Sequence, residues 1–268
     1  MKRFTLICGL VMSVIVLLAG VVSLLWTPYP PQAVSAANRY QNPGPTHWLG
    51  TDALGMDTAS RLMVGAQTTL MVGVLAVAIA AVVGVPFGVF IGLGHRGLGQ
   101  VVARASDILY ALPAVLLAIL LAASIGASIW TATIAIGVAT VPVFIRMSRA
   151  ATITVMEQEY ILAAELSGAS RLAIARRHVL PNIAPMLGVQ AAASFSMAIL
   201  AEAGLSYLGL SAPATVPTWG GMLRDASVFV SPWQVLIPGL AIVWAVLAFN
   251  LLGDGMRDYL DPRLSEAR

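Results

Sequence analysis

The chain has very few of the charged residues on which soluble proteins depend. Only 10% of its 268 residues are charged, against about 25% in an average soluble domain. Its only lysine is Lys2, and the phosphate-binding loop of nucleotide-binding proteins needs a lysine after its last glycine. The chain therefore contains no such loop, and any ATP chemistry connected with it must belong to another subunit.

Residues suited to other catalytic chemistry are equally scarce. The single cysteine, Cys8, lies in an apolar run, so no disulfide can form within the chain. The three histidines, His47, His95 and His178, lie in separate loops, and no cluster has metal-ligand spacing. No Gly-x-Ser-x-Gly nucleophile motif is present. We predict no catalytic residue, no metal site and no cofactor in this chain.

Long apolar runs dominate what is present. Hydrophobic residues make up 59% of the chain and the mean hydropathy is +0.87. About 20 apolar residues cross the hydrocarbon core as a helix, and the runs are too long and too little alternating for barrel strands. We predict an all-α integral membrane protein with six transmembrane helices. The six runs are 6–26, 69–93, 106–126, 128–145, 186–210 and 236–253.

The N-terminus has some features of a signal peptide. Lys2 and Arg3 precede an apolar run, and Ala33-Val34-Ser35-Ala36 follows it. The run of about 20 residues exceeds the 7–15 of a signal peptide. We therefore expect residues 1–26 to be an uncleaved first transmembrane helix.

The basic residues are distributed unevenly between the loops. A cytoplasmic N-terminus followed by six spans places 12 of the 15 on the inside, as the positive-inside rule requires. The inside residues are Lys2, Arg3, Arg96, Arg104, Arg146, Arg149, Arg171, Arg176, Arg177, Arg257, Arg263 and Arg268, and the outside ones are Arg39, Arg61 and Arg224. We predict cytoplasmic N- and C-termini. No basic patch interleaved with aromatic residues accompanies the net charge of +3, so we predict no nucleic-acid partner.

Residues 27–66 form a polar segment that this topology places outside the cytoplasm. Its prolines exclude a long helix, and Asp57 has the position of a helix N-cap. In the span that follows, Gly84, Gly88 and Gly92 recur every four residues. Small residues at that spacing allow two helices to approach closely in lipid, so we predict a packing role for them.

A polar island at residues 146–185 interrupts the apolar sequence. We expect one short helix over 156–167 ending before Gly168, and a second that Ser170 caps and that Pro181 stops after Leu180. The second helix would place three apolar residues on one face beside two arginines, and the first would leave a groove of small residues. The apolar residues are Leu172, Ala175 and Val179, the arginines Arg176 and Arg177, and the small residues Ala164 and Gly168. The pattern alone allows either docking on a partner or an amphipathic pair on the membrane surface.

Glu202 is a carboxylate within an apolar run, in its outer half. Such residues are costly in a membrane and indicate function by default. A structural hydrogen bond to a neighbouring helix and a proton or substrate role both remain open at this point.

Four separate blocks together resemble one family of membrane proteins. They are 47–61, with Leu-Gly-Thr-Asp-x-Leu-Gly; 163–182, with two alanines, Gly168 and Leu-Pro; 202–210; and 250–263, with Gly-Asp-Gly-x-Arg-Asp-x-Leu-Asp-Pro. The chain resembles the second permease subunit of dipeptide, oligopeptide and nickel ABC importers over nearly its whole length. The resemblance implies a type I permease domain at 67–256 and a cytoplasmic tail at 257–268.

The sequence departs from the family pattern at four positions. Leu162 stands where the general loop motif has a glutamate, and His178 where it has an apolar residue. Met56 and Gln67 stand where this branch commonly has arginine. The last two affect the expected contacts with a binding protein or sister subunit rather than the family assignment.

The resemblance also implies the working partners. A sister permease would pair with this chain in the bacterial cytoplasmic membrane, two ATPase subunits holding Mg–ATP would dock below, and an extracytoplasmic binding protein would deliver substrate. The loop at 146–185 would couple the permease to one ATPase. The coupling residues would be Ala163, Ala164, Gly168, Ser170, Arg176, His178, Leu180 and Pro181.

Other functions remain possible from the sequence. Within the family, peptides and nickel or a metal chelate are alternative substrates, and we favour peptides. In another class, an ion-gradient-driven transporter would use Glu202 as a proton-linked site, although the internal repeats common in such carriers are not evident. A membrane-anchored scaffold would leave the four matching blocks unexplained.

Overall fold

The computed structural model describes residues 2–94, 96–213, 215–229 and 232–260. These residues form helices and loops, and the only β-type pairing among them is an isolated bridge between Thr51 and Asp57. The helices are α1 (Lys2–Val22), α2 (Thr58–Gly92), α3 (Arg96–Ala111), α4 (Ala114–Ile125), α5 (Ile129–Met156), α6 (Glu159–Leu166), α7 (Arg171–Ile174), α8 (Leu180–Tyr207), α9 (Trp219–Phe229) and α10 (Pro232–Leu260), with a 3₁₀ turn at Ala36–Asn38 and a π-helical turn at Ala175–Val179. His95 and the end of the tail at 261–268 lie outside the described residues.

The helices confirm the predicted membrane architecture. Five stretches are long and apolar enough to cross a membrane, and there are six if the bent pair α3–α4 is counted as one span. Several helices extend beyond the apolar runs at one end or both, because a helix continues into polar surroundings until its backbone is capped or broken. Thus α2 begins at Thr58 rather than near 69, and the Asp57 side chain accepts a 2.8 Å hydrogen bond from the Ser60 N–H at its start.

The segment expected as a straight third span at 106–126 is a bent pair of helices instead. The axes of α3 and α4 meet at 87°, with the break at Leu112 and Pro113. Proline has no N–H to donate to the preceding turn, and its ring disfavours helical backbone at the residue before it. The bend is attached to α5, because Arg146 lies 3.5 Å from Asp107 Oδ1 and 3.8 Å from the centre of the Tyr110 ring.

Helices α2 and α5 form the most extensive contact in the molecule. A Cβ atom built on Gly88 would lie 1.9 Å from Ser148 Oγ and 2.5 Å from the Ile145 carbonyl oxygen. Gly84 and Gly92 face α5 in the same way, one turn to either side. The prediction that these glycines serve helix packing is therefore confirmed.

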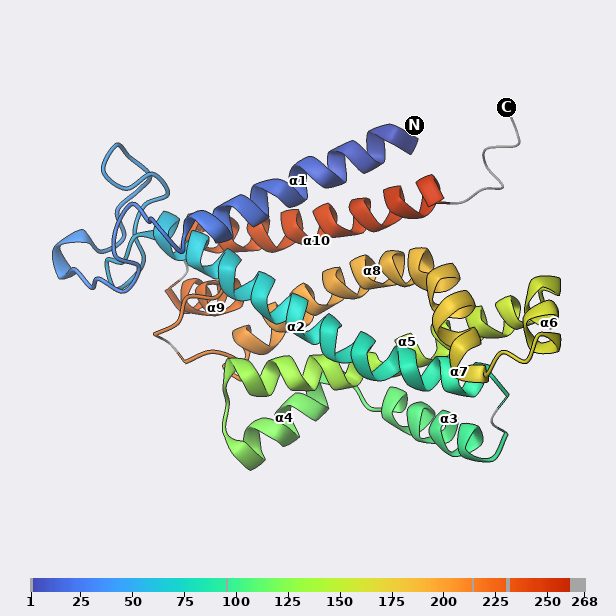
Figure 1. Cartoon of the computed structure of the whole chain (residues 1–268). Helices are drawn as coiled ribbons and strands as arrows, with labels where there is room; N and C mark the ends of the chain where they lie inside the picture. The colour runs from blue at the N-terminus through green and yellow to red at the C-terminus, as the bar shows by residue number, and fades with distance from the viewer. Residues whose placement is uncertain (1, 95, 214, 230–231, 261–268) are drawn as a thin grey trace.

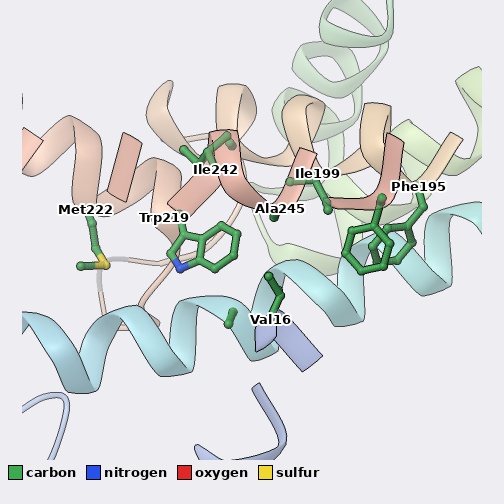
Figure 2. Packing of buried hydrophobic residues seen from close by; sticks show 10 residues of the cluster. Val16, Phe195, Ile199, Trp219, Met222, Ile242 and Ala245 are labelled. Atoms are coloured by element: carbon green, nitrogen blue, oxygen red, sulfur yellow. The ribbon is translucent and has the colours of Figure 1, made fainter. Parts of the chain in front are cut away.

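The remaining helices pack around this pair. In Figure 1, α1 and α10 lie side by side and antiparallel, with α2 and α8 below them. A core of buried apolar residues joins α1, α2, α8, α9 and α10, and Figure 2 shows Val16, Trp219 and Ile242 meeting within it. Phe195 and Phe249 extend this core, with ring centres 4.3 Å apart.

Two ends of the bundle can be told apart in Figure 1. The segment end carries the residues between α1 and α2 (the 23–57 segment) together with α9, and the elbow end carries α6 and α7. At the segment end, Nδ1 of the buried His47 lies 2.8 Å from Oδ1 of Asp57. The backbone N–H of Tyr29 donates a hydrogen bond to Ser60 Oγ. Gln234 of α10 donates to the Thr51 carbonyl oxygen. These bonds fix the 23–57 segment against α2 and α10.

The two departures from the family pattern at this end make contacts within the chain. Met56 is buried, and its sulfur accepts a 3.4 Å contact from Arg61 Nη1, which also pairs with Asp52. Gln67 Oε1 lies 3.4 Å from Ser23 Oγ, between α1 and α2. Both residues therefore contribute to the internal packing of this end.

Candidate functional site

The candidate site is the elbow, defined here as residues 157–179, between α5 and α8. Its first arm, α6, ends in a Schellman motif. The Gly168 N–H donates to the Glu165 carbonyl (2.9 Å) and the Ala169 N–H to the Ala164 carbonyl (3.1 Å). Gly168 has φ of +79°, a conformation that costs glycine little. Its predicted role in ending this helix is confirmed.

The second arm begins as predicted and continues differently. Ser170 Oγ accepts a 3.2 Å hydrogen bond from the Ala173 N–H and caps α7. The helix does not stop at Leu180 and Pro181, as the sequence suggested, but passes through the π-helical turn into α8. The Leu180 N–H bonds to the Ala175 carbonyl, and Pro181 follows directly after this turn as the second residue of α8.

The inner face of the elbow packs on the ends of two spanning helices. Ile161, Ile174 and Val179 are fully buried against Val89 of α2 and Ala151 of α5, within one apolar cluster. Burying side chains of this size contributes about 1.5–3 kcal/mol each. The elbow is therefore a rigid extension of the bundle rather than a free loop.

One polar contact reinforces this attachment. Arg171 Nη1 donates a 2.9 Å hydrogen bond to the carbonyl oxygen of Leu93, directly after the last residue of α2. Helix C-termini leave carbonyl groups without partners and favour a nearby positive charge. Sequence analysis counted Arg171 only among the basic residues, and nothing in the pattern linked it to a residue 78 positions away.

The outer face of the elbow exposes large apolar side chains next to arginines. Leu166 is 82% exposed and Leu172 69%, and Leu162 is also exposed. Arg176 and Arg177 lie beside them and help to line a surface hollow of about 450 Å³. Exposed leucines on a rigid support flanked by charges are typical of a protein-docking surface.

The eight predicted coupling residues are divided between the faces of the elbow. Four of the first six are exposed, namely Ala163, Gly168, Ser170 and Arg176, while Ala164 and His178 are half-buried and Ala164 packs against the apolar cluster. His178 lies beside Tyr160, with ring centres 6.0 Å apart. Leu180 and Pro181 are exposed at the start of α8.

One expectation about the surface of the elbow is wrong. Leu172 does not share a face with Ala175 and Val179, because it is exposed and they are buried. The wider π turn adds to this separation by rotating Val179 further from Leu172 than a regular helix would. The surface hollow lies beside α7. Space is nevertheless open at Gly168, where a Cβ atom would meet nothing within 4 Å.

Glu202 is fully buried in α8 and makes hydrogen bonds to two other parts of the chain. Its Oε2 accepts from Thr69 Oγ1 of α2 at 3.5 Å, and its Oε1 accepts from Ser211 Oγ at 3.4 Å. The carboxylate thus links α8 to α2 and to the loop that precedes α9. This geometry matches the structural hydrogen bond considered for it.

Sequence analysis missed a hollow between α5, α8 and α10, called the polar hollow here for the amide and charged side chains among its otherwise apolar lining. Its volume is about 630 Å³. The residues that line it are Met147, Asn182, Pro185, Met186, Val189, Gln190, Ala193, Asn250, Gly253, Asp254 and Arg257. The signal was present, because Asn250, Asp254 and Arg257 recur at the spacing of one helix face. A hollow with amide, acidic and basic groups can bind the polar backbone of a passing solute.

Comparison of the sequence with known proteins relates this chain to membrane transport proteins. Residues 84–266 match the family described as binding-protein-dependent transport system inner membrane component. The dipeptide transport system permease protein DppC of Alkalihalophilus pseudofirmus is 40% identical over 266 residues, which cover 98% of this chain and 87% of that protein. The di/tripeptide transport system permease protein DppC of Pseudomonas aeruginosa is 42% identical, over 82% of this chain and 73% of its own length.

A solved structure shares the fold. The inward-facing MetNI methionine ABC transporter contains a chain that superposes with a TM-score of 0.62 at 19% sequence identity. The match covers 75% of this chain and 96% of that one. The arrangement of helices is therefore one that a solved ABC transporter also uses.

Proposed function

The chain belongs to the family of binding-protein-dependent transport system inner membrane components, and from this we propose that it carries peptides across the membrane. It is a membrane-spanning permease subunit of an ATP-driven importer, with the type I importer fold. The observation that carries the peptide assignment is the 40% identity, over 98% of the chain, with a dipeptide permease. Di- and oligopeptides are the proposed substrates.

The elbow is the proposed docking site for an ATPase subunit. Its exposed leucines would enter an apolar groove of the ATPase, and Arg176 and Arg177 would contact acidic residues at the rim. Its buried face and the Arg171 bond to α2 would transmit the motion of the ATPase to the spanning helices. Mg–ATP would be held by two ATPase subunits, one on this elbow and the other on a sister permease.

The orientation that fits the charges places the elbow end in the cytoplasm. Arg104, Arg149, Arg176 and Arg257 belong to the elbow-end halves of the helices or to the elbow, as positive-inside membrane proteins require. The N-terminus and the tail would be cytoplasmic in the bacterial inner membrane. The 23–57 segment would lie outside, where the binding protein delivers the peptide.

The transport path is proposed to pass along the polar hollow between α5, α8 and α10, closed on its other side by the sister permease. The hollow presents Gln190, Asn250 and Arg257 to a peptide, whose amide groups need hydrogen-bond partners once they leave water. Rigid-body rocking of the two permeases would open the path alternately to each side of the membrane.

Co-purification and uptake together test this function. The tagged chain is purified from native membranes in mild detergent, its partners are identified by mass spectrometry, and the complex is reconstituted with its binding protein. ATP-dependent uptake of a labelled dipeptide is the expected result. Nickel uptake without peptide uptake would transfer the complex to the metal branch of the family. Uptake by the chain alone, driven by an ion gradient, would contradict the importer function.

A further inference from the structure

Four exposed tryptophans of this chain gather at one end of the bundle. Trp26 follows the end of α1, Trp130 and Trp233 are the second residues of α5 and α10, and Trp48 lies in the 23–57 segment. All four side chains are exposed. In Figure 1, α1 ends and α5 and α10 begin at the segment end.

The indole N–H groups of these four residues have no hydrogen-bond partner among the residues that the structure describes. None of them donates to another described residue, whereas buried Trp219 donates to the Leu62 carbonyl and Trp244, midway along α10, donates to the Met12 carbonyl. Tryptophan is enriched at the membrane–water interface, where the ring contacts acyl chains and the N–H meets headgroups or water. Exposed indole groups with free N–H groups therefore suit a position at such an interface.

Trp48 extends this arrangement onto a part of the chain that does not cross the membrane. Its ring centre lies 6.4 Å from that of Trp26, and the two rings are 60% and 53% exposed. Trp26 lies just beyond the end of α1, on which Leu18 and Val21 are exposed, and next to the exposed Leu25. Through Trp26, the pair is thus close in sequence to the exposed apolar residues of a helix long and apolar enough to cross a membrane.

The backbone beneath Trp48 is held in place. The preceding residue, His47, is buried, lies 2.8 Å from Asp57 at the start of α2, and stacks at 4.5 Å on the ring of Tyr29. Tyr29 in turn donates from its hydroxyl to the Thr46 carbonyl at 2.6 Å. An exposed ring on a fixed base is preorganised for contact, so binding loses little conformational entropy.

From these observations we propose that Trp48, with Trp26, seats the 23–57 segment in the headgroup region of the bilayer. The partner is the lipid surface at the segment end, namely the glycerol and headgroup layer of phospholipids. The segment then rests on the membrane beside α1. The inference depends on the membrane-spanning fold and does not depend on which solute is transported.

Spin labels test the depth of this position in the assembled complex. In a Cys8→Ser background, cysteines are introduced singly at Trp48, at Val82 and at Arg39, and the complex is reconstituted in phosphatidylcholine–phosphatidylglycerol vesicles. Val82 is a highly exposed residue within the apolar run of α2, and Arg39 is an exposed charge in the same segment as Trp48. The label at 48 should be more accessible to oxygen and less accessible to a water-soluble nickel chelate than the label at 39, with the label at 82 deeper still. Equal chelate access at 48 and 39 would overturn the proposal.

Fluorescence quenching provides a second test that keeps the native Trp48. The Trp48 signal is the difference between the wild-type complex and a Trp48→Phe complex. A nitroxide near the headgroup of the lipid should remove more of this signal than one near the end of the acyl chain. Quenching by aqueous iodide alone would place Trp48 in water, and protection from both quenchers would assign its surface to a protein partner. Either result would overturn the proposal.

Discussion

Arg171 Nη1 donates to the carbonyl oxygen of Leu93 at 2.9 Å, and this bond joins the second arm of the elbow to the end of α2. The bond lies beside the apolar cluster in which Ile174 of the elbow packs against Val89 of α2. A displacement of the elbow therefore acts directly on α2, which packs along most of its length against α5. The elbow and the spanning helices can move as one body.

Replacing Arg171 with alanine should weaken the link between ATP hydrolysis and transport. The substitution removes the partner of the Leu93 carbonyl and costs about 1 kcal/mol locally, while the apolar contacts of the elbow remain. We expect the complex to assemble and hydrolyse ATP but to import fewer peptides for each ATP hydrolysed. The ratio is measured in proteoliposomes.

The control for this variant is Arg104→Ala. Arg104 is an exposed basic residue of α3 that makes no hydrogen bond or ion pair with any described residue. Its loss should leave the transport ratio at the wild-type value. Equal ratios in the Arg171 and Arg104 variants would show that the bond to Leu93 is not needed for coupling.

Gly88→Ala should destabilise the contact between α2 and α5. The new methyl group would lie 2.5 Å from a backbone oxygen of α5, so the helices must separate. Overpacking of this kind costs about 1–3 kcal/mol in free energy of unfolding. A lower midpoint of thermal unfolding in detergent is the expected result. Gly239→Ala in α10, where a Cβ atom meets nothing within 4 Å, serves as the control and should keep the wild-type midpoint.

Features set by local chemistry were predicted well from the sequence. Gly168 ends a helix because of its own backbone conformation, and Ser170 caps the next through a neighbouring N–H. Both depend on residues only a few positions apart. The small-residue stripe that includes Gly88 was equally clear, because helix packing in lipid leaves a regular spacing.

Features set by contacts between distant residues were not predicted. The side of the elbow on which Leu172 lies depends on a π turn that no spacing indicated. Pro181 was expected to stop a helix, yet the helix continues past it by way of the π-helical turn. The polar hollow needs three helices together, so no single stretch of sequence reveals it.

Glu202 distinguishes an ATP-driven importer from an ion-gradient-driven carrier. Glu202→Gln keeps a group that can bond to Thr69 and Ser211, so ATP-driven uptake should remain near the wild-type level. Glu202→Ala leaves both hydroxyl groups without their partner and should lower the free energy of unfolding by about 1–3 kcal/mol. Uptake and thermal unfolding are measured for both variants. Loss of uptake in a stably folded glutamine variant would instead indicate a proton-linked role.

Ala193→Trp should block the polar hollow. Ala193 lines the hollow on α8, and an indole ring there would fill part of its 630 Å³. Peptide uptake should fall strongly while assembly and ATP hydrolysis persist, because the elbow is unchanged. Met197→Trp places the same ring one turn further along α8, at an exposed position outside the hollow, and should leave uptake intact. Equal uptake by both variants would exclude the hollow from the path.

Gly168→Arg should uncouple ATP hydrolysis from transport. The position has open space around it, so an arginine fits sterically on this chain, but it would project from the proposed docking surface into the ATPase.

Gly126→Arg is the matched control, since Gly126 also has positive φ and open space but lies in the turn between α4 and α5. Gly126 has φ of +90° and ψ of 151°, a conformation that side chains tolerate less well than the left-handed one of Gly168, so the control carries at least as much backbone strain. A defect confined to the Gly168 variant therefore reports on docking. We expect the Gly168 variant to lose ATPase subunits during purification, or to hydrolyse ATP without importing peptide, while the Gly126 variant transports. Wild-type import by the Gly168 variant would show that the ATPase docks elsewhere.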